Sequence, residues 1–361
     1  MNKLGKICIF VGMIFGAELQ AWYLQHKRDL PWRETKNAYK IWLSEIILQQ
    51  TRVEQGLPYY LRFVERFKTV VDFANANEDD ILHLWQGLGY YSRGRNMHKA
   101  AGIVRDQYDG VFPVDYKTLL TLPGVGEYTA AAISSFANNE AQAVLDGNVF
   151  RVLSRYYGIN IPINSTEGKK VFATIAKENL DQQQPALYNQ AIMDFGAIHC
   201  KPKQPLCASC MFRASCYALL QGEVDQLPVK LKAKASKDRY FNYLILKDDN
   251  RVLMSKRGGG DVWQNLYEFP LIESDRTLSI PEILEHELFV QYFGHTANIN
   301  ILQKQTKHVL SHQNIYATFF EVRLAGSLIQ KKSSWDYVFL KDLDKLAKHK
   351  LIFTFLERSN F

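Results

Sequence analysis

Four cysteines lie close together in an arrangement that can bind metal. Of the five cysteines in the 361 residues, only Cys8 lies outside the segment C-x6-C-x2-C-x5-C formed by Cys200, Cys207, Cys210 and Cys216. Four thiolates can hold either a zinc ion or an iron–sulfur cluster, and the spacing leaves both open. Because a disulfide framework would distribute its cysteines along the chain, the grouping predicts a metal site in a reducing compartment.

Glu45 is a carboxyl group in an apolar segment that runs from Trp42 to Leu48. A carboxyl group deprived of water has a raised pKa and can donate a proton near neutral pH. The alternative is a glutamate on the one polar face of the helix, beside Ser44 and Gln49. The local sequence does not decide between the two.

Asp146 is predicted to be a different kind of carboxyl group. The run Asp146-Gly147-Asn148 opens a helical pattern that reaches about Tyr157, so Asp146 is expected at the N-cap, where the helix dipole and nearby N–H groups favour the anion. N-cap aspartates are also common without any catalytic role. One neutral and one ionised carboxyl group together suit glycosidic cleavage through an oxocarbenium-like state.

A Gly-x-Gly turn separates two predicted helices over residues 115–137. Asp115 can cap the first helix, Pro123 ends it, and the second begins near Tyr128. Positive φ angles are expected at Gly124 and Gly126. Such a turn exposes backbone N–H groups at a helix N-terminus and can bind a phosphate, although a simple tight turn would have the same sequence.

The elements that must position these residues fall into two parts. Helical periodicity dominates up to Cys216, and strand-like runs follow a linker at 227–236. Helices are expected at 17–30, 38–50, 58–67, 78–86, 93–108, 115–122 and 281–288, and strands at 240–246, 251–255 and 315–322. We therefore predict a multidomain chain with an all-α domain at 17–226 and an α+β domain at 237–361.

Charge and the N-terminal segment limit the functional classes. The chain has 44 Lys and Arg against 37 Asp and Glu, a net charge of +7, which fits a nucleic-acid surface without requiring one. The apolar run at residues 7–15 is too short to span a bilayer. We expect a non-native extension or a short packing segment there rather than an export signal, and no membrane association elsewhere.

The motifs together resemble a known family. Leu122-Pro123-Gly124-Val125-Gly126, followed by Tyr128 and Asp146, resembles the helix-hairpin-helix DNA glycosylases. The segment from Ser44 to Val53 and the cysteine spacing narrow the resemblance to adenine DNA glycosylases of the MutY type. It implies a [4Fe–4S] cluster on the loop at 200–216, Glu45 as the acid that protonates the leaving adenine, and Asp146 as the carboxylate that stabilises the sugar cation. Whether Asp146 bonds covalently to the sugar stays open.

The same resemblance assigns further residues. Tyr128 stands where endonuclease III, a lyase, has a Schiff-base lysine, which implies a glycosylase without lyase activity. Asn148 joins the catalytic group. The residues implied in DNA or base binding in this domain are Arg33, Gln50, Thr51, Leu88, Tyr90, Gly124, Gly126 and Gln190.

Residues 237–361 resemble the MutT-like (Nudix-like) domain of the same family through Arg257-Gly258-Gly259 and the run from Trp263 to Pro270. The Arg-Glu-x-x-Glu-Glu helix of an active pyrophosphohydrolase is absent, so the domain is expected to be a reader rather than a hydrolase. The resemblance implies that it reads 8-oxoguanine opposite adenine. His308 and Ser311 lie in a segment that resembles the family's Phe-Ser-His loop. Leu310 replaces the usual phenylalanine, which puts stacking by that side chain in doubt.

The sequence therefore predicts a monofunctional glycosylase of base excision repair that removes adenine opposite 8-oxoguanine or guanine in double-stranded DNA. It is expected to act as a monomer in the cytoplasm, near the nucleoid. The alternatives are a thymine-mismatch glycosylase, a non-catalytic iron–sulfur DNA-binding protein, and a nucleotide hydrolase in the C-terminal domain.

Overall fold

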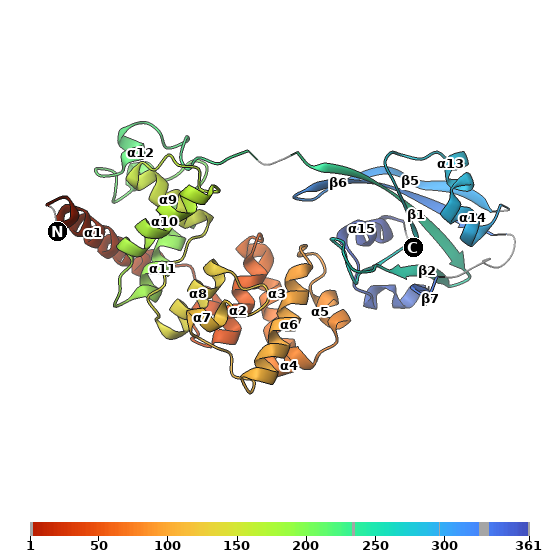
Figure 1. Ribbon diagram of the computed structural model, residues 1–361, viewed down its shortest axis with the longest axis horizontal. Coiled ribbons are helices and arrows are strands. Elements are labelled where there is room, and N and C mark those ends of the chain that lie inside the picture. Colours follow the sequence, from red (N-terminus) through yellow and green to blue (C-terminus); the bar gives the residue numbers. More distant parts are fainter. Residues whose placement is uncertain (1–2, 233–234, 296, 325–331, 360–361) are drawn as a thin grey trace. The chain divides into compact units, whose positions relative to one another are not determined.

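The computed structural model describes residues 3–232, 235–295, 297–324 and 332–359, with side chains from Phe15 onward (Figure 1). The chain divides into two compact units. The first contains Met1–Asn75 and Asn96–Lys232, and the second contains Ala76–Arg95 and Ala233–Phe361. The domain boundaries at 226 and 237 stay a prediction.

The first unit is helical, and no strand occurs in its described residues, as predicted. No helix in the described part of the chain is long and apolar enough to cross a membrane. The helices of this unit, with α6 shared between the units, are α1 (Lys3–His26), α2 (Ala38–Leu48), α3 (Val53–Arg66), α4 (Val70–Asn75), α6 (Ser92–Gln107), α7 (Tyr116–Leu119), α8 (Glu127–Asn138), α9 (Gly147–Tyr157), α10 (Thr166–Asn179), α11 (Pro185–Asp194) and α12 (Tyr217–Leu220). Short turns of helix cover Pro31–Arg33, Phe195–His199 and Cys207–Ser209.

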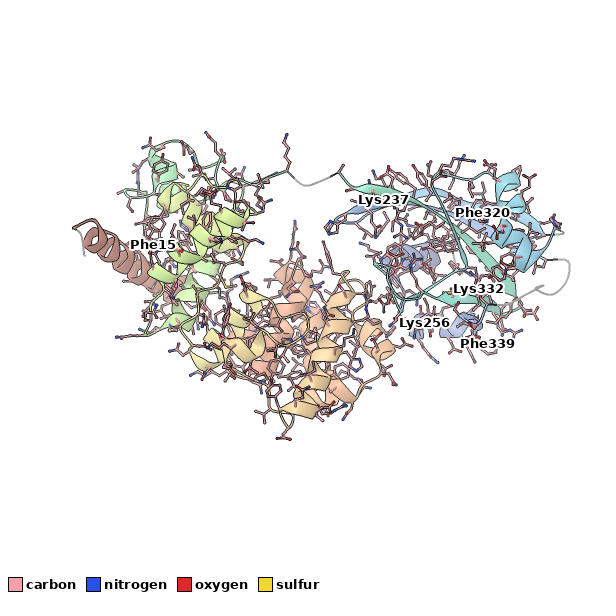
Figure 2. All side chains as sticks on the ribbon, in the orientation of Figure 1. Phe15, Lys237, Lys256, Phe320, Lys332 and Phe339 are labelled. Atoms are coloured by element: carbon pink, nitrogen blue, oxygen red, sulfur yellow. The ribbon has the colours of Figure 1, made fainter. Side chains whose placement is uncertain are left out.

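The first helix differs from the prediction at both ends. The segment expected at 17–30 is part of α1, which begins at Lys3 and ends at His26. Phe15, labelled in Figure 2, is fully buried, and its ring centroid lies 4.5 Å from that of Tyr156 and 4.8 Å from that of Phe212. Leu24, near the C-terminal end of the helix, is 64% exposed. The end of the apolar run therefore packs into the core.

Helix α2 passes through the interior of the first unit. Nine of its eleven residues are buried, and Asn37 caps its N-terminus by accepting a hydrogen bond from Lys40 N. A helix that is apolar on almost every side is stable only when protein surrounds it. Helices α3 and α8 pack against it. Any polar side chain on α2 is thereby withdrawn from bulk water.

The second unit is built around a mixed sheet in the order β3-β2-β1-β6-β5. Strand β1 pairs in parallel with β6 and antiparallel with β2 and β4, while β7 pairs with β2 and β5 with β6, both antiparallel. The strands are β1 (Lys237–Asp248), β2 (Arg251–Lys256), β3 (Tyr267–Glu268), β4 (Leu271–Ser274), β5 (Asn298–Val309), β6 (Gln313–Arg323) and β7 (Trp335–Phe339). The helices are α5 (Glu78–Leu84), α13 (Ile280–Glu285), α14 (Glu287–Phe293) and α15 (Lys350–Arg358), with a short turn of helix at Leu340–Lys345.

Adjacent residues of β6 face opposite sides of the sheet, because side chains alternate along a strand. Phe320, labelled in Figure 2, belongs to the core that includes Phe289 and Phe293 of α14. Phe319 stacks on Phe355 of α15 with ring centroids 4.0 Å apart. Helices therefore cover both faces, which confirms the predicted α+β class.

Candidate active site

Helices α2, α8 and α9 place three polar side chains around one cavity of the first unit. Glu45 lies on α2, Tyr128 in the first turn of α8, and Asp146 at the N-cap of α9. The cavity has a volume of about 700 Å³, within the range of ~300–1,000 Å³ for pockets that bind small molecules. Eight of the predicted residues line it: Glu45, Asp146, Tyr128, Asn148, Arg33, Gln50, Thr51 and Gln190.

Glu45 is only 7% exposed. Burial raises the pKa of its carboxyl group to about 7, and the negative charge of Asp146 adds to this rise. Tyr128 opposes it by donating a hydrogen bond from its hydroxyl to Glu45 Oε2 at 2.8 Å, as does the positive charge of Arg33. A carboxyl group with this pKa is protonated in a large fraction of molecules at neutral pH, which favours the first of the two interpretations that the local sequence left open.

Asp146 caps α9, as predicted. Its Oδ1 accepts hydrogen bonds from the backbone N–H groups of Asn148 and Val149, both at 2.8 Å, and its Oδ2 accepts one from Asn148 Nδ2 at 2.6 Å. Removal from bulk water nevertheless raises the pKa of Asp146, and these hydrogen bonds lower it only in part. The local sequence shows the stabilising groups of the helix end, whereas the cost of burial appears only in the folded chain.

A buried carboxylate holds the arginines of the cavity wall. Asp194 is fully buried and accepts hydrogen bonds from both Arg33 and Arg28, including Arg33 Nη2 at 2.6 Å and Arg28 Nε at 2.9 Å. Although burial alone would raise the pKa of Asp194, the hydrogen bonds and charges of Arg33 and Arg28 lower it. Nearby, Tyr23 donates a hydrogen bond to Gln190 Oε1 at 2.7 Å. The wall is thus rigidly built.

Sequence reasoning found Arg33 and Gln190 and missed Asp194, Arg28 and Tyr23. Asp194 could have been found, because it follows apolar residues of α11 in the same way that Glu45 follows those of α2. The arginines that act on the carboxyl groups of Asp194 and Glu45, Arg28 and Arg33, lie outside the helices that carry these groups. No local pattern identifies them.

The hairpin between α7 and α8 follows the prediction in part. Asp115 caps α7 by accepting a hydrogen bond from Thr118 N at 2.8 Å. Gly124 has φ +80°, and a Cβ there would come within 2.9 Å of Asn96 Cβ. The expected positive φ at Gly126 is wrong, because Gly126 is the extended N-cap of α8 with φ −95°. Its lack of a side chain leaves the first N–H groups of α8 open to approach.

Helix α2 ends in an irregular turn beside the cavity. Gln50 has φ 57°, a left-handed conformation that is uncommon for a residue with a side chain. Gln49 fixes the turn to α8 by donating a hydrogen bond to Thr129 Oγ1 at 3.2 Å. Gln50 and Thr51 consequently lie at the edge of the cavity.

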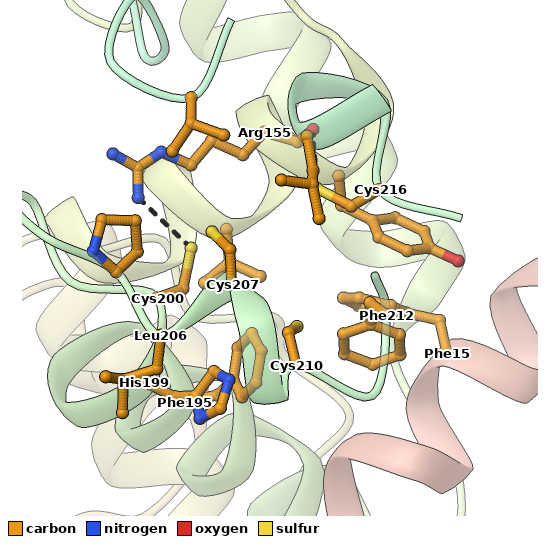
Figure 3. Close-up of a pocket in the computed structure, with 15 residues that line it drawn as sticks. Phe15, Arg155, Phe195, His199, Cys200, Leu206, Cys207, Cys210, Phe212 and Cys216 are labelled. Atoms are coloured by element: carbon orange, nitrogen blue, oxygen red, sulfur yellow. Dashed lines mark hydrogen bonds between the residues drawn. The ribbon is translucent and has the colours of Figure 1, made fainter. Parts of the chain in front are cut away.

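The four clustered cysteines line a second cavity of the first unit, which Figure 3 shows together with its aromatic wall. Arg155 donates a hydrogen bond to Cys200 Sγ at 3.4 Å. Burial raises the pKa of Cys210 to about 11 and also raises the pKa of Cys207 and Cys216. Thiolates there need a compensating positive charge. Among the described residues, no three His, Cys, Asp or Glu side chains are placed as ligands of one metal ion.

The remaining predicted residues belong to the second unit. Tyr90 is 48% exposed, and its hydroxyl forms a short hydrogen bond with Ser311 Oγ. Leu88 is only 6% exposed. His308 packs near Trp263, with ring centroids 5.7 Å apart, and burial lowers its pKa to about 4. The structure therefore brings Tyr90 and Ser311 together and leaves Leu88 in the interior.

Comparisons with known proteins cover both units. Residues 43–177 match the model for the HhH-GPD superfamily of base excision DNA repair proteins, and residues 242–358 match the NUDIX domain model. An adenine DNA glycosylase of Buchnera aphidicola subsp. Baizongia pistaciae is 36% identical over 308 residues, which are 84% of each chain. The adenine DNA glycosylase of Homo sapiens is 40% identical over 222 residues, or 59% of this chain and 41% of the human one.

Solved structures share the fold of the helical part. A thermostable thymine-DNA glycosylase matches with a TM-score of 0.54 and 28% identity over 58% of this chain and 97% of its own. Endonuclease III in a non-covalent DNA complex matches with a TM-score of 0.52 at 21% identity, covering 62% of this chain and 99% of its own. Because the Buchnera relative matches along nearly its whole length, the family is established. The chain belongs to the adenine DNA glycosylases, a family of base excision DNA repair enzymes.

Proposed function

We propose that this enzyme hydrolyses the N-glycosidic bond of adenine paired with 8-oxoguanine or guanine in double-stranded DNA. The observation that carries the proposal is the placement of Glu45 and Asp146 in one cavity that is large enough for a nucleobase. A duplex buries the glycosidic bond, so the adenine must first leave the base stack and enter this cavity. The enzyme is proposed to act as a monomer in the cytoplasm, near the nucleoid.

Glu45 is the proposed general acid. It donates its proton to a ring nitrogen of adenine, and the electrons of the bond between C1′ and N9 leave with the base. Its pKa of about 7 supports this role, because a carboxyl group of ordinary pKa would be ionised and unable to donate. Tyr128 orients the acid through its hydrogen bond to Oε2.

Asp146 is the proposed partner of the sugar cation. A carboxylate stabilises the positive charge that develops at C1′, and water then adds to complete hydrolysis. Asn148 holds one carboxylate oxygen of Asp146 through its side-chain amide, which directs the group from the end of α9. Arg33 and Gln190 line the same cavity and are proposed to hold the extruded adenine.

The enzyme is proposed to be monofunctional and to leave an intact abasic site. A lyase forms a Schiff base through an amine, and Tyr128 has none. In the described residues that line the cavity, no lysine occurs. Strand cleavage should therefore appear only after treatment of the product with base or heat.

Binding of the DNA backbone is proposed to involve the hairpin at Gly124 and Gly126. The first N–H groups of α8 suit a phosphate oxygen, and this contact reads no base. The four cysteines, at 200, 207, 210 and 216, are proposed to hold a [4Fe–4S] cluster that supports the loop without taking part in hydrolysis. The donor set of four thiols in one apolar cavity fits such a group. Iron content and visible absorbance test it against zinc.

The second unit is proposed to recognise the base opposite adenine. Tyr90 is the candidate for insertion beside that base, and the hydrogen bond of its hydroxyl to Ser311 supports a shared location for the two. His308 is proposed to support the loop that carries Ser311, because its ring is half-buried against Trp263. Leu88 is buried and would have to move before it could reach DNA.

An excision assay on matched duplexes tests the proposal. Purified enzyme is incubated with A:8-oxoG, A:G, A:T and T:G duplexes that differ at one base. We expect release of adenine opposite 8-oxoguanine first and opposite guanine more slowly. The T:G duplex is the decisive control, because the chain shares its fold with a thymine-DNA glycosylase. Faster release of thymine than of adenine would contradict the proposal.

A further inference from the structure

The turn that carries Tyr90 has an unusual backbone. Positive φ angles occur at Gly87 (98°), Gly89 (71°) and Tyr90 (49°) within four residues. A tyrosine rarely adopts a left-handed conformation, and such a residue persists only where surrounding contacts determine it. The side chain of Tyr90 is nevertheless 48% exposed, so its own packing supplies little of that restraint. Contacts from buried neighbouring residues must therefore hold the backbone of the turn.

Arg93 lies beneath this turn. It is 8% exposed and donates hydrogen bonds from Nη2 to Gly89 O at 3.1 Å and to Leu88 O at 3.4 Å. The guanidinium carbon lies 5.0 Å from the ring centroid of the fully buried Trp85 and 5.6 Å from that of Tyr90. Trp85 adds a hydrogen bond from Nε1 to Gly89 O at 3.0 Å.

The location of Arg93 is costly in two ways. Burial lowers the pKa of its guanidinium to about 10, which reflects the loss of hydration. Arg93 also lies in the first turn of α6, where the helix dipole disfavours a cation. Its guanidinium faces the carbonyl groups of the turn. An exposed side chain at this position would keep its hydration, so the burial of Arg93 indicates a role inside the turn.

We infer that Arg93 is a positioning residue that sets the Leu88–Tyr90 turn before DNA binds, so that the Tyr90 ring projects ready for insertion beside the base opposite adenine. The inference rests on the proposed role of Tyr90. Arg93 touches no DNA in this scheme. Its Nη2 donates to two carbonyl groups while the planar guanidinium lies over the Trp85 ring, and the compact ammonium group of lysine does not combine these two contacts.

A double-mutant cycle tests the inference on the full-length enzyme. Single-turnover excision of A:8-oxoG is measured for wild type, Arg93→Met, Tyr90→Ala and the double variant, with 2-aminopurine fluorescence reporting base extrusion. We expect Arg93→Met and Tyr90→Ala each to slow extrusion roughly tenfold, with no further loss in the double variant. Arg93→Lys should recover only part of the rate. Amide hydrogen exchange without DNA should be faster at residues 88–91 in Arg93→Met.

Each outcome has one meaning. Additive losses in the cycle, or an unchanged exchange rate in the turn, would overturn the inference. If Tyr90→Ala behaves as wild type, the proposed role of Tyr90 fails instead, while the exchange measurement still reports on Arg93. Arg62→Met is the matched control, because Arg62 lies over the Tyr59 ring at 4.3 Å on the exposed side of α3. It should leave every measurement unchanged.

Discussion

Two regions of the molecule hold carboxyl groups in opposite ways. In the cavity of the first unit, the hydrogen bond to the Glu45 carboxyl group comes from the neutral hydroxyl of Tyr128. In the second unit, Asp261 is held by the guanidinium groups of Arg239, at 2.9 Å, and Arg257. The pKa of Glu45 is raised to about 7, whereas hydrogen bonds from Arg239 and Arg257 lower the pKa of Asp261.

The difference lies in the charge of the partner. A neutral donor leaves the cost of burial largely uncompensated, so the proton stays available for transfer. A cationic partner removes that cost and fixes the anion as a structural element. Asp194 follows the second pattern inside the first unit, because Arg28 and Arg33 surround it. Burial alone therefore does not mark an active-site acid in this protein.

The largest expected effect comes from removal of the proposed acid. Glu45→Gln keeps the shape and can still accept the hydrogen bond of Tyr128, but it has no proton to transfer. Excision of adenine should fall by about 10²–10⁴-fold, while binding of A:8-oxoG duplex is retained. Single-turnover kinetics measure the excision rate, and a gel-shift assay measures duplex binding. Turnover equal to that of the exposed control Glu65→Gln would remove Glu45 from the mechanism.

The same substitution should stabilise the fold at high pH. A carboxyl group whose pKa is raised from 4.5 to about 7 in the folded state binds more protons than the unfolded chain between these values. Folded-state stability therefore falls as pH rises through this window, by up to about 3 kcal/mol above pH 7. Glu45→Gln should lack this loss. Equal stability of wild type and variant in denaturant titrations at pH 8 would contradict the raised pKa.

Asp261→Asn should lower the stability of the fold, in contrast to Glu45→Gln, which should raise it at high pH. It leaves the Arg239 and Arg257 guanidinium groups without their shared anion in a mostly buried site. We expect a loss of about 2 kcal/mol in the second unit, less than for a fully buried pair because the Asp261 side chain keeps 22% exposure. Thermal unfolding measures it. Asp342→Asn, whose partner Lys345 lies at the surface, is the control and should show no change. A loss as large in the control would argue against the comparison.

Tyr128→Phe should have the smallest effect of these substitutions, and the effect should appear in the pH dependence of the excision rate. The hydrogen bond from Tyr128 lowers the pKa of Glu45, so its removal raises that pKa further above 7. The acid then stays protonated to higher pH, and the alkaline limb of the rate–pH profile moves upward by a fraction of a pH unit. A shift toward lower pH would mean that the cavity compensates in some other way.

Much of the first unit could be predicted from local sequence. The helical periodicity, the N-caps at Asp115 and Asp146 and the apolar surroundings of Glu45 each depend on neighbours within one or two turns. The cysteine spacing grouped four side chains that do line one cavity. Predictions failed where the local pattern was weak, as for the short helix α4.

Strand β5 shows why the second unit was harder. It is an edge strand whose residues are mostly exposed, and its register with β6 shifts between Ile301 and Thr306. An exposed strand carries polar side chains on both faces, and each irregularity interrupts the alternation that marks a strand. The parallel pairing of β1 with β6 joins segments separated by more than sixty residues, and no local pattern encodes it.

The sequence by itself determined the type and chemistry of this protein: a helical domain with an acid in an apolar helix, a glycine hairpin, four grouped cysteines and a second domain without hydrolase carboxylates. The tertiary structure alone decided which charges meet. It placed Arg28 and Arg33 on Asp194, left Glu45 with a neutral donor, and put Arg93 against the backbone carbonyl groups of the turn that carries Tyr90. The reason is that a pKa and a side-chain orientation depend on desolvation and on partners distant in sequence, which only folding brings into contact.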